Sequence, residues 1–161
     1  MSKNFAAFAA LRGDEDLPIL SRFHQFVLPV MGYGNRRVSC SAGRSYAGVG
    51  PDGVLYPCMR FVGVDRYSIG RVPEGVDAAA ARSFRLGPGR PYDQRQPCSG
   101  CWAAPLCCGP CYACSEMFGP GDGEPIDYQC AYRLAAAEAA VSLFNRLKED
   151  NPERLLSLIH I

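Results

Sequence analysis

The sequence predicts a small α+β domain that is irregular and rich in loops. Glycine (17) and proline (13) together make up nearly a fifth of the 161 residues, which favours turns over long regular elements. Two short extended runs flank the turn sequence Pro-Asp-Gly at 51–53, as in a β-hairpin. One uninterrupted helical pattern follows near the end of the chain, so we expect a hairpin, a loop-rich middle and a closing C-terminal helix.

Residues 1–35 are expected to be mainly helical. Acidic residues and Pro18 stand where the segment 14–30 begins, and both are typical of a helix start. Leu20, Phe23, Val27 and Val30 form an apolar stripe at helical spacing that requires a packing partner. Pro29 should kink or end this helix.

The hairpin is expected to use 45–50 and 54–58 as its strands, with a further short strand within 66–72. Residues 73–97 are expected to be loops, apart from a helical turn within 76–84. Residues 98–129 are dense in cysteine, glycine and proline, and ligands rather than a core should order them.

The closing helix is predicted over 131–149, where alanine, leucine, glutamate and arginine dominate. Its expected buried face consists of Leu134, Val141, Phe144 and Leu147. Asn151 and Pro152 should end it, and 153–159 should form a short terminal turn.

Charge and hydropathy exclude several classes of partner. The formal net charge is +1 and no run of five like charges occurs, so the basic stripe of a nucleic-acid-binding surface is missing. No segment approaches the roughly 20 apolar residues that cross a bilayer. The first 16 residues lack a clear signal-peptide cleavage site, so we expect a cytoplasmic protein. Together, the three observations predict a protein that binds neither nucleic acid nor membrane.

Nine cysteines dominate the chemistry of the chain, and six of them fall within 98–114. In a reducing compartment such closely spaced thiols are typical of metal or cluster ligands rather than disulfides. The count is odd, and Cys107 and Cys108 are adjacent. Because His24 and His160 lie outside the cysteine-rich segment, any metal site there must be rich in thiolates.

The cysteine spacing leaves two kinds of site open. Cys98 and Cys101 form a Cys-x2-Cys pair that can bring two thiolates to one metal from a tight turn. Nine cysteines suffice for two four-thiolate sites, whether zinc or iron–sulfur, and nine thiols that merely pack as small hydrophobes would be an oxidation hazard. Zinc ribbons usually pair two such knuckles, each on its own hairpin, whereas the other ligands here are spread over irregular gaps, which favours clusters.

The series from Cys40 to Cys130 resembles the seven-cysteine signature of the SPASM domain. That domain is the C-terminal extension of many radical S-adenosylmethionine enzymes that modify peptides and proteins, including anaerobic sulfatase-maturating enzymes and quinohemoprotein amine dehydrogenase maturases. The resemblance rests on CSAGRSYAGVGPDGVLYPC at 40–58 and CSGCWAAPLCCGPC at 98–111. It covers 40–130, with 131–161 similar to the family's closing helix and a tail. It makes 1–39 a helical linker and the end of a missing catalytic barrel.

The resemblance implies two auxiliary [4Fe–4S] clusters. By position, the second cluster would be bound by Cys98, Cys101, Cys107 and Cys130, and the first by Cys40, Cys58 and Cys111. The fourth ligand of the first cluster would be Cys114 or Cys108, or one iron would stay open. We favour Cys114, because relatives usually have glycine at 108. Some relatives have an extra cysteine where this chain has Tyr46.

The catalytic cluster of a radical enzyme needs Cys-x3-Cys-x2-Cys near the start of a barrel. Cys107, Cys111 and Cys114 have that spacing, but only 47 residues follow them and Ala113 replaces the usual aromatic residue. We therefore expect an auxiliary domain that does not cleave S-adenosylmethionine by itself. That cofactor would be bound only by the missing catalytic domain.

The expected partners are that missing radical S-adenosylmethionine barrel and a peptide or protein substrate. The clusters would relay an electron or bind substrate. Residues near the ligands in sequence are expected to pack around the clusters: Tyr46, Tyr56, Arg60 and Trp102. Alternative functions are a zinc-stabilised interaction module and a stand-alone iron–sulfur electron carrier.

Overall fold

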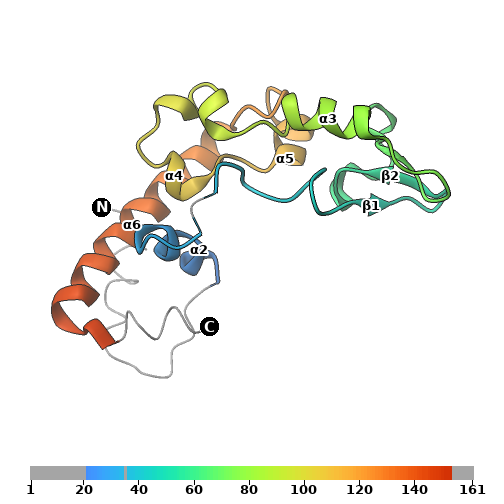
Figure 1. The fold of residues 1–161 in the computed structure, drawn as a ribbon. Helices are drawn as coiled ribbons and strands as arrows, with labels where there is room; N and C mark the ends of the chain where they lie inside the picture. Colours follow the sequence, from blue (N-terminus) through green and yellow to red (C-terminus); the bar gives the residue numbers. More distant parts are fainter. Residues whose placement is uncertain (1–20, 35, 154–161) are drawn as a thin grey trace. The chain divides into compact units, whose positions relative to one another are not determined.

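The computed structural model describes residues 21–34 and 36–153, with the side chains of 21–24 left aside (Figure 1). The chain divides into two compact units. We call Met1–Asn35, Pro105–Cys107 and Ala131–Ile161 the helical unit, and Arg36–Ala104 with Cys108–Cys130 the cysteine unit. The described elements are helices and a small antiparallel sheet joined by many loops, so the predicted α+β class is confirmed.

The sheet lies in the cysteine unit and has four short strands in the order β1-β2-β3-β4. The predicted hairpin is present as β1 (Gly48–Val49) and β2 (Val54–Tyr56), with Val49 opposite Leu55. Its turn depends on Gly53, whose φ of +79° is in the left-handed region that favours glycine. The predicted third strand is reduced to β3 (Gly70–Arg71), and β4 (Gly75–Val76), in a segment expected to be loop, pairs with it.

Helix α3 (Ala78–Leu86) replaces the single helical turn expected from the sequence. It extends further because the Asp77 side chain caps it, accepting hydrogen bonds from the N–H groups of Ala79 (2.8 Å) and Ala80 (3.0 Å). One face of α3 packs against the sheet, where Ala81 joins the buried pair Leu55 and Ile69.

An aromatic core fills the cysteine unit. Phe84 of α3 makes edge-on contacts with Phe61 and Tyr112, with ring centroids 5.5 and 5.9 Å apart. Val54 and Tyr56 of β2 complete the buried group together with Ala42 and Ala113. This core joins the hairpin, α3 and the cysteine-rich segment, so the positions of several cysteines follow from ordinary packing.

The cysteine-rich segment contains more helix than the sequence predicted. It contains a 3-10 turn (Cys98–Gly100), α4 (Ala104–Cys107) and α5 (Tyr112–Phe118). Single 3-10 turns also occur earlier in the chain: Met59–Phe61, Asp65–Tyr67 and Tyr92–Gln94. Periodicity could not reveal α5, because its seven residues, YACSEMF, are too few to show a helical repeat.

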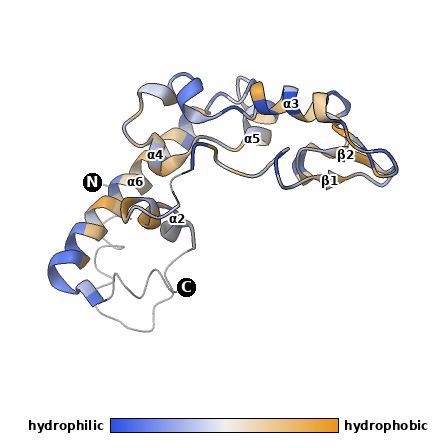
Figure 2. Ribbon diagram, in the orientation of Figure 1, coloured by the Kyte–Doolittle hydropathy of each residue, from blue (hydrophilic) through white to orange (hydrophobic). Residues whose placement is uncertain are grey.

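The helical unit contains α2 (Ser21–Val30) and most of α6 (Asp127–Asp150), whose last turns are hydrophilic (Figure 2). Helix α2 ends one residue after Pro29, as predicted, and Val27 of the expected stripe is fully buried. Leu20, the side chain of Phe23 and most of the predicted terminal turn lie outside the described residues.

Helix α6 begins four residues before its predicted start and ends before Asn151, as predicted. Its fully buried side chains are Ala137 and Ala140, whereas the larger apolar residues predicted for this face are only half-buried: Leu134, Val141, Phe144 and Leu147. A small alanine side chain is easily covered completely by its neighbours, whereas parts of these larger side chains remain exposed. No helix among the described residues is both long and apolar enough to cross a membrane.

Candidate metal centre

Four cysteines of the cysteine unit are placed by the elements around the aromatic core. Cys58 follows β2 and precedes a 3-10 turn in extended conformation, and Cys111 occupies the N-cap position of α5. Cys114 lies one helical turn further along α5, on the same side as Cys111. Cys40 is exposed and stands two residues before the bridge between Ala42 and Tyr46.

Electrostatic coupling links three of these thiols. Burial raises the pKa of the Cys58 thiol, and the backbone N–H groups of Arg60 and Phe61 oppose this by donating to its sulfur. The thiols of Cys111 and Cys40 raise that pKa further, because three negative charges would repel one another. A bound cation would remove this repulsion, which makes the group a suitable ligand set for a metal.

Arg60 provides the positive charge of this site. Its Nη1 donates to the sulfurs of Cys111 at 3.5 Å and Cys114 at 3.2 Å. These two thiols raise the pKa of the guanidinium, Cys111 most strongly. The sequence favoured packing over lining an electron path as the role of Arg60. Its position two residues after Cys58 gave no sign of contacts with sulfurs more than fifty residues away.

Backbone packing fixes the Cys58 turn. A Cβ atom at Gly48 would lie 2.8 Å from both the carbonyl carbon of Cys58 and the nitrogen of Met59, so β1 approaches this turn as only glycine allows. Pro57 is fully buried, and Cys58 and Cys111 both pack against the aromatic core. The core therefore helps to position two of the four thiols.

The four cysteines expected to bind the second cluster divide between the two units. In the cysteine unit, Cys98 and Cys101 form the predicted tight turn, in which the N–H of Cys101 donates to the carbonyl of Cys98 at 3.1 Å. Cys130 lies there too, in the first turn of α6. Cys107 belongs to the helical unit, where Nη1 of Arg133 lies 3.3 Å from its carbonyl oxygen and 3.7 Å from its sulfur.

Cys108 differs from the other cysteines in conformation. Its φ of +58° lies in the left-handed region that favours glycine. The buried thiol donates to the carbonyl oxygen of Arg36 at 3.0 Å. The backbone thus explains why a glycine would suit this position.

The chemistry of the donor set fits a thiolate-bound metal or cluster. No disulfide joins any of the nine cysteines, all of which lie within the described part of the chain. Within 21–34 and 36–153, no three Cys, His, Asp or Glu side chains form a group that could hold one ion. Among the other residues expected near clusters, Tyr56 is buried, whereas Tyr46 and Trp102 are exposed.

Comparison with known proteins adds no relative. No protein-family model matches the chain, and no curated protein matches it.

Proposed function

We propose that this chain binds two [4Fe–4S] clusters as the auxiliary, C-terminal part of a radical S-adenosylmethionine enzyme that modifies a peptide or protein. The observation that carries the proposal is the gathering of Cys40, Cys58, Cys111 and Cys114 in one unit, with Arg60 directed at two of their sulfurs. Cysteine thiolates are the usual ligands of such clusters.

The contacts of Arg60 support one composition of the first cluster, and the composition of the second follows from the resemblance alone. Cys40, Cys58, Cys111 and Cys114 would hold the first cluster, since Arg60 donates to both Cys111 and Cys114. Cys98, Cys101, Cys107 and Cys130 would hold the second. Cys108 is left over, and its thiol is engaged with the carbonyl of Arg36.

The clusters, when bound, would supply one-electron transfer or a site for substrate. The protein's own part is to order this glycine-rich segment around them and to balance their negative charge. Arg60 would do so at the first thiol group and Arg133 at Cys107. Cleavage of S-adenosylmethionine would belong to a separate barrel, and the reducing cytoplasm would keep the thiols available.

Anaerobic reconstitution followed by iron and sulfide analysis tests the proposal. We expect about eight irons and eight sulfides per chain. Cys114→Ser should reduce the iron content or change the electron paramagnetic resonance spectrum of one cluster, whereas the matched variant Cys108→Ser should keep the full content and spectrum. A colourless, iron-free protein with about two zincs would refute the proposal and favour a zinc-stabilised interaction module.

A further inference from the structure

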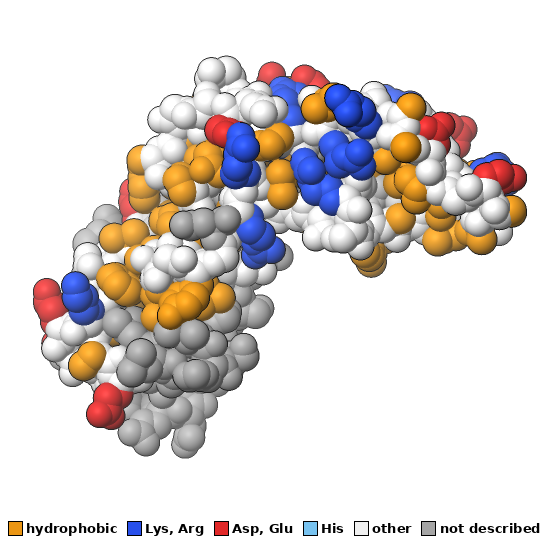
Figure 3. All heavy atoms as spheres, viewed as in Figure 1, with side chains coloured by type: hydrophobic (Ala, Val, Ile, Leu, Met, Phe, Trp, Pro, Cys, Tyr) orange, Lys and Arg blue, Asp and Glu red, His pale blue; other side chains and the backbone are white. Residues whose placement is uncertain are grey.

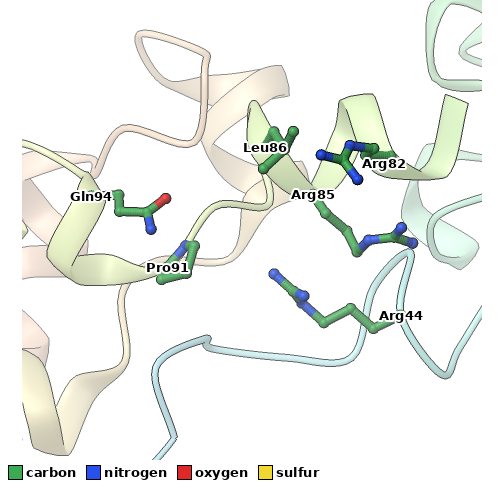
Figure 4. A pocket seen from close by; sticks show the side chains of 6 residues that line it. All are labelled: Arg44, Arg82, Arg85, Leu86, Pro91 and Gln94. Atoms are coloured by element: carbon green, nitrogen blue, oxygen red, sulfur yellow. The ribbon is translucent and has the colours of Figure 1, made fainter. Parts of the chain in front are cut away.

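Three arginines line one hollow on the cysteine unit. The hollow has a volume of about 300 Å³ and is bounded by Arg44, Arg82, Arg85, Leu86, Pro91 and Gln94 (Figure 4). Arg82, Arg85 and Leu86 come from α3, Arg44 from the turn before the hairpin, and Pro91 and Gln94 from the segment after α3. Figure 3 shows basic side chains gathered on this face.

These three arginines lack the carboxylate partner that two other arginines of the same unit have. Arg37 pairs with Asp93 and Arg90 with Asp122, but Arg44, Arg82 and Arg85 form no ion pair with any carboxylate in the described part of the chain. None of the six lining residues is acidic. Like charges three residues apart on a helix, such as Arg82 and Arg85, repel each other, so an anion in the hollow would relieve the repulsion.

Two of the guanidinium groups are held in place by backbone oxygens. Arg85 donates from Nη1 to the carbonyl of Gly43 at 3.0 Å, and Arg44 donates from Nη2 to the carbonyl of Gly89 at 3.1 Å. Each guanidinium has five N–H donors, so each keeps donors for a ligand.

The core fixes the two glycines that anchor these arginines. A Cβ atom at Gly43 would lie 2.7 Å from the Phe84 ring, and one at Gly89 would lie 2.9 Å from it. Phe84 belongs to α3 and is buried. Helix α3, which carries Arg82 and Arg85, therefore also contacts Gly43 and Gly89 through Phe84. The shape of the hollow is thus fixed by the packing of the core.

The lining indicates the chemical class of the ligand. Guanidinium groups bind carboxylates in bidentate geometry, and three of them suit more than one carboxylate. Leu86, which is 62% exposed, and Pro91 add an apolar surface, and Gln94 adds an amide. A hollow of about 300 Å³ has room for a few side chains of a short peptide segment.

We propose that this hollow binds an acidic segment of a peptide that also carries an apolar side chain. The peptide's role as substrate rests on the proposed function, but binding itself does not depend on the clusters. Free phosphate is also an anion that guanidinium groups bind, so the test includes it as a competitor of the peptide.

The test measures fluorescence anisotropy of the labelled peptide Gly-Glu-Leu-Glu-Leu-Glu-Gly with the full chain at low ionic strength, where exposed charges are least screened. A glutamine-for-glutamate version of the peptide and inorganic phosphate are the ligand controls. The variants are Arg82→Gln, the double variant Arg82→Gln/Arg85→Gln, and Arg146→Gln as a control that removes one exposed charge on α6. Circular dichroism and iron content are recorded for every variant.

We expect the acidic peptide to bind at least tenfold more tightly than its glutamine version. Arg82→Gln should weaken binding severalfold and the double variant at least tenfold, with no effect of Arg146→Gln and no change in iron content. Equal affinity for both peptides, equal loss in Arg146→Gln, or displacement by an equal concentration of phosphate would overturn the inference. Iron is measured separately, so failure of peptide binding with iron retained refutes this inference alone.

Discussion

Replacing Arg60 by glutamine tests whether its guanidinium acts on the first thiol group. The side chain is exposed, with Nη1 at 3.2 and 3.5 Å from two sulfurs. A pair of charges at such a distance is worth about 1 kcal/mol near water, after discounting for solvent screening. Reduction of the proposed cluster would add negative charge, which the guanidinium would stabilise, so its loss should lower the reduction potential by about 40 mV for a one-electron couple.

The assay is an anaerobic redox titration of the reconstituted chain, followed by electron paramagnetic resonance. Arg66→Gln is the matched control, since Arg66 is also exposed but stacks over the ring of Tyr67 at 4.9 Å. We expect only one of the two cluster signals to shift in Arg60→Gln. An unchanged or higher potential, or an equal shift in Arg66→Gln, would show that the Arg60 contacts do not act on a cluster.

Three further predictions concern stability and titration. Cys108→Gly relieves a left-handed φ but removes a buried thiol and its hydrogen bond to the Arg36 carbonyl, two effects of about 1 kcal/mol each that should nearly cancel, so a clear rise or fall in melting temperature would contradict this. Asp77→Ala should lower the stability by about 1 kcal/mol through loss of the α3 cap, or roughly 2–4 °C in melting temperature, whereas the exposed Glu74→Ala should not. Burial and its hydrogen bond to Glu116 raise the pKa of Tyr67, so this tyrosine should ionise above about pH 10 and its stabilising effect should disappear as the pH rises through that raised value. Glu116→Gln should lower that pKa in an absorbance titration referenced to Tyr67→Phe, and an unchanged value would refute the assignment.

The sequence was most informative where a signal is local. Pro-Asp-Gly at 51–53 predicted the hairpin because the turn needs a positive φ at Gly53. The Cys-x2-Cys spacing of Cys98 and Cys101 predicted their tight turn, and Asn151 correctly marked the end of α6. Each of these features is decided by a few consecutive residues and their backbone preferences.

The sequence failed where contacts with distant residues decide the outcome. Strand β4 consists of Gly75 and Val76, which become a strand only by pairing with β3. The buried positions of α6 were assigned to large residues, while its fully buried side chains are Ala137 and Ala140. Helix propensity and apolar periodicity contain no information on how near a neighbouring element comes.

By itself, the sequence determined the number and spacing of the thiols, the absence of a histidine among them, and the hairpin and closing helix. Only the tertiary structure decided that Arg60 meets Cys111 and Cys114, and that Arg44 joins Arg82 and Arg85 around one hollow. The physical reason is that each of these contacts joins residues about forty to fifty positions apart in the sequence. The packing of Phe84, Tyr112 and the hairpin brings the two ends of each such loop together.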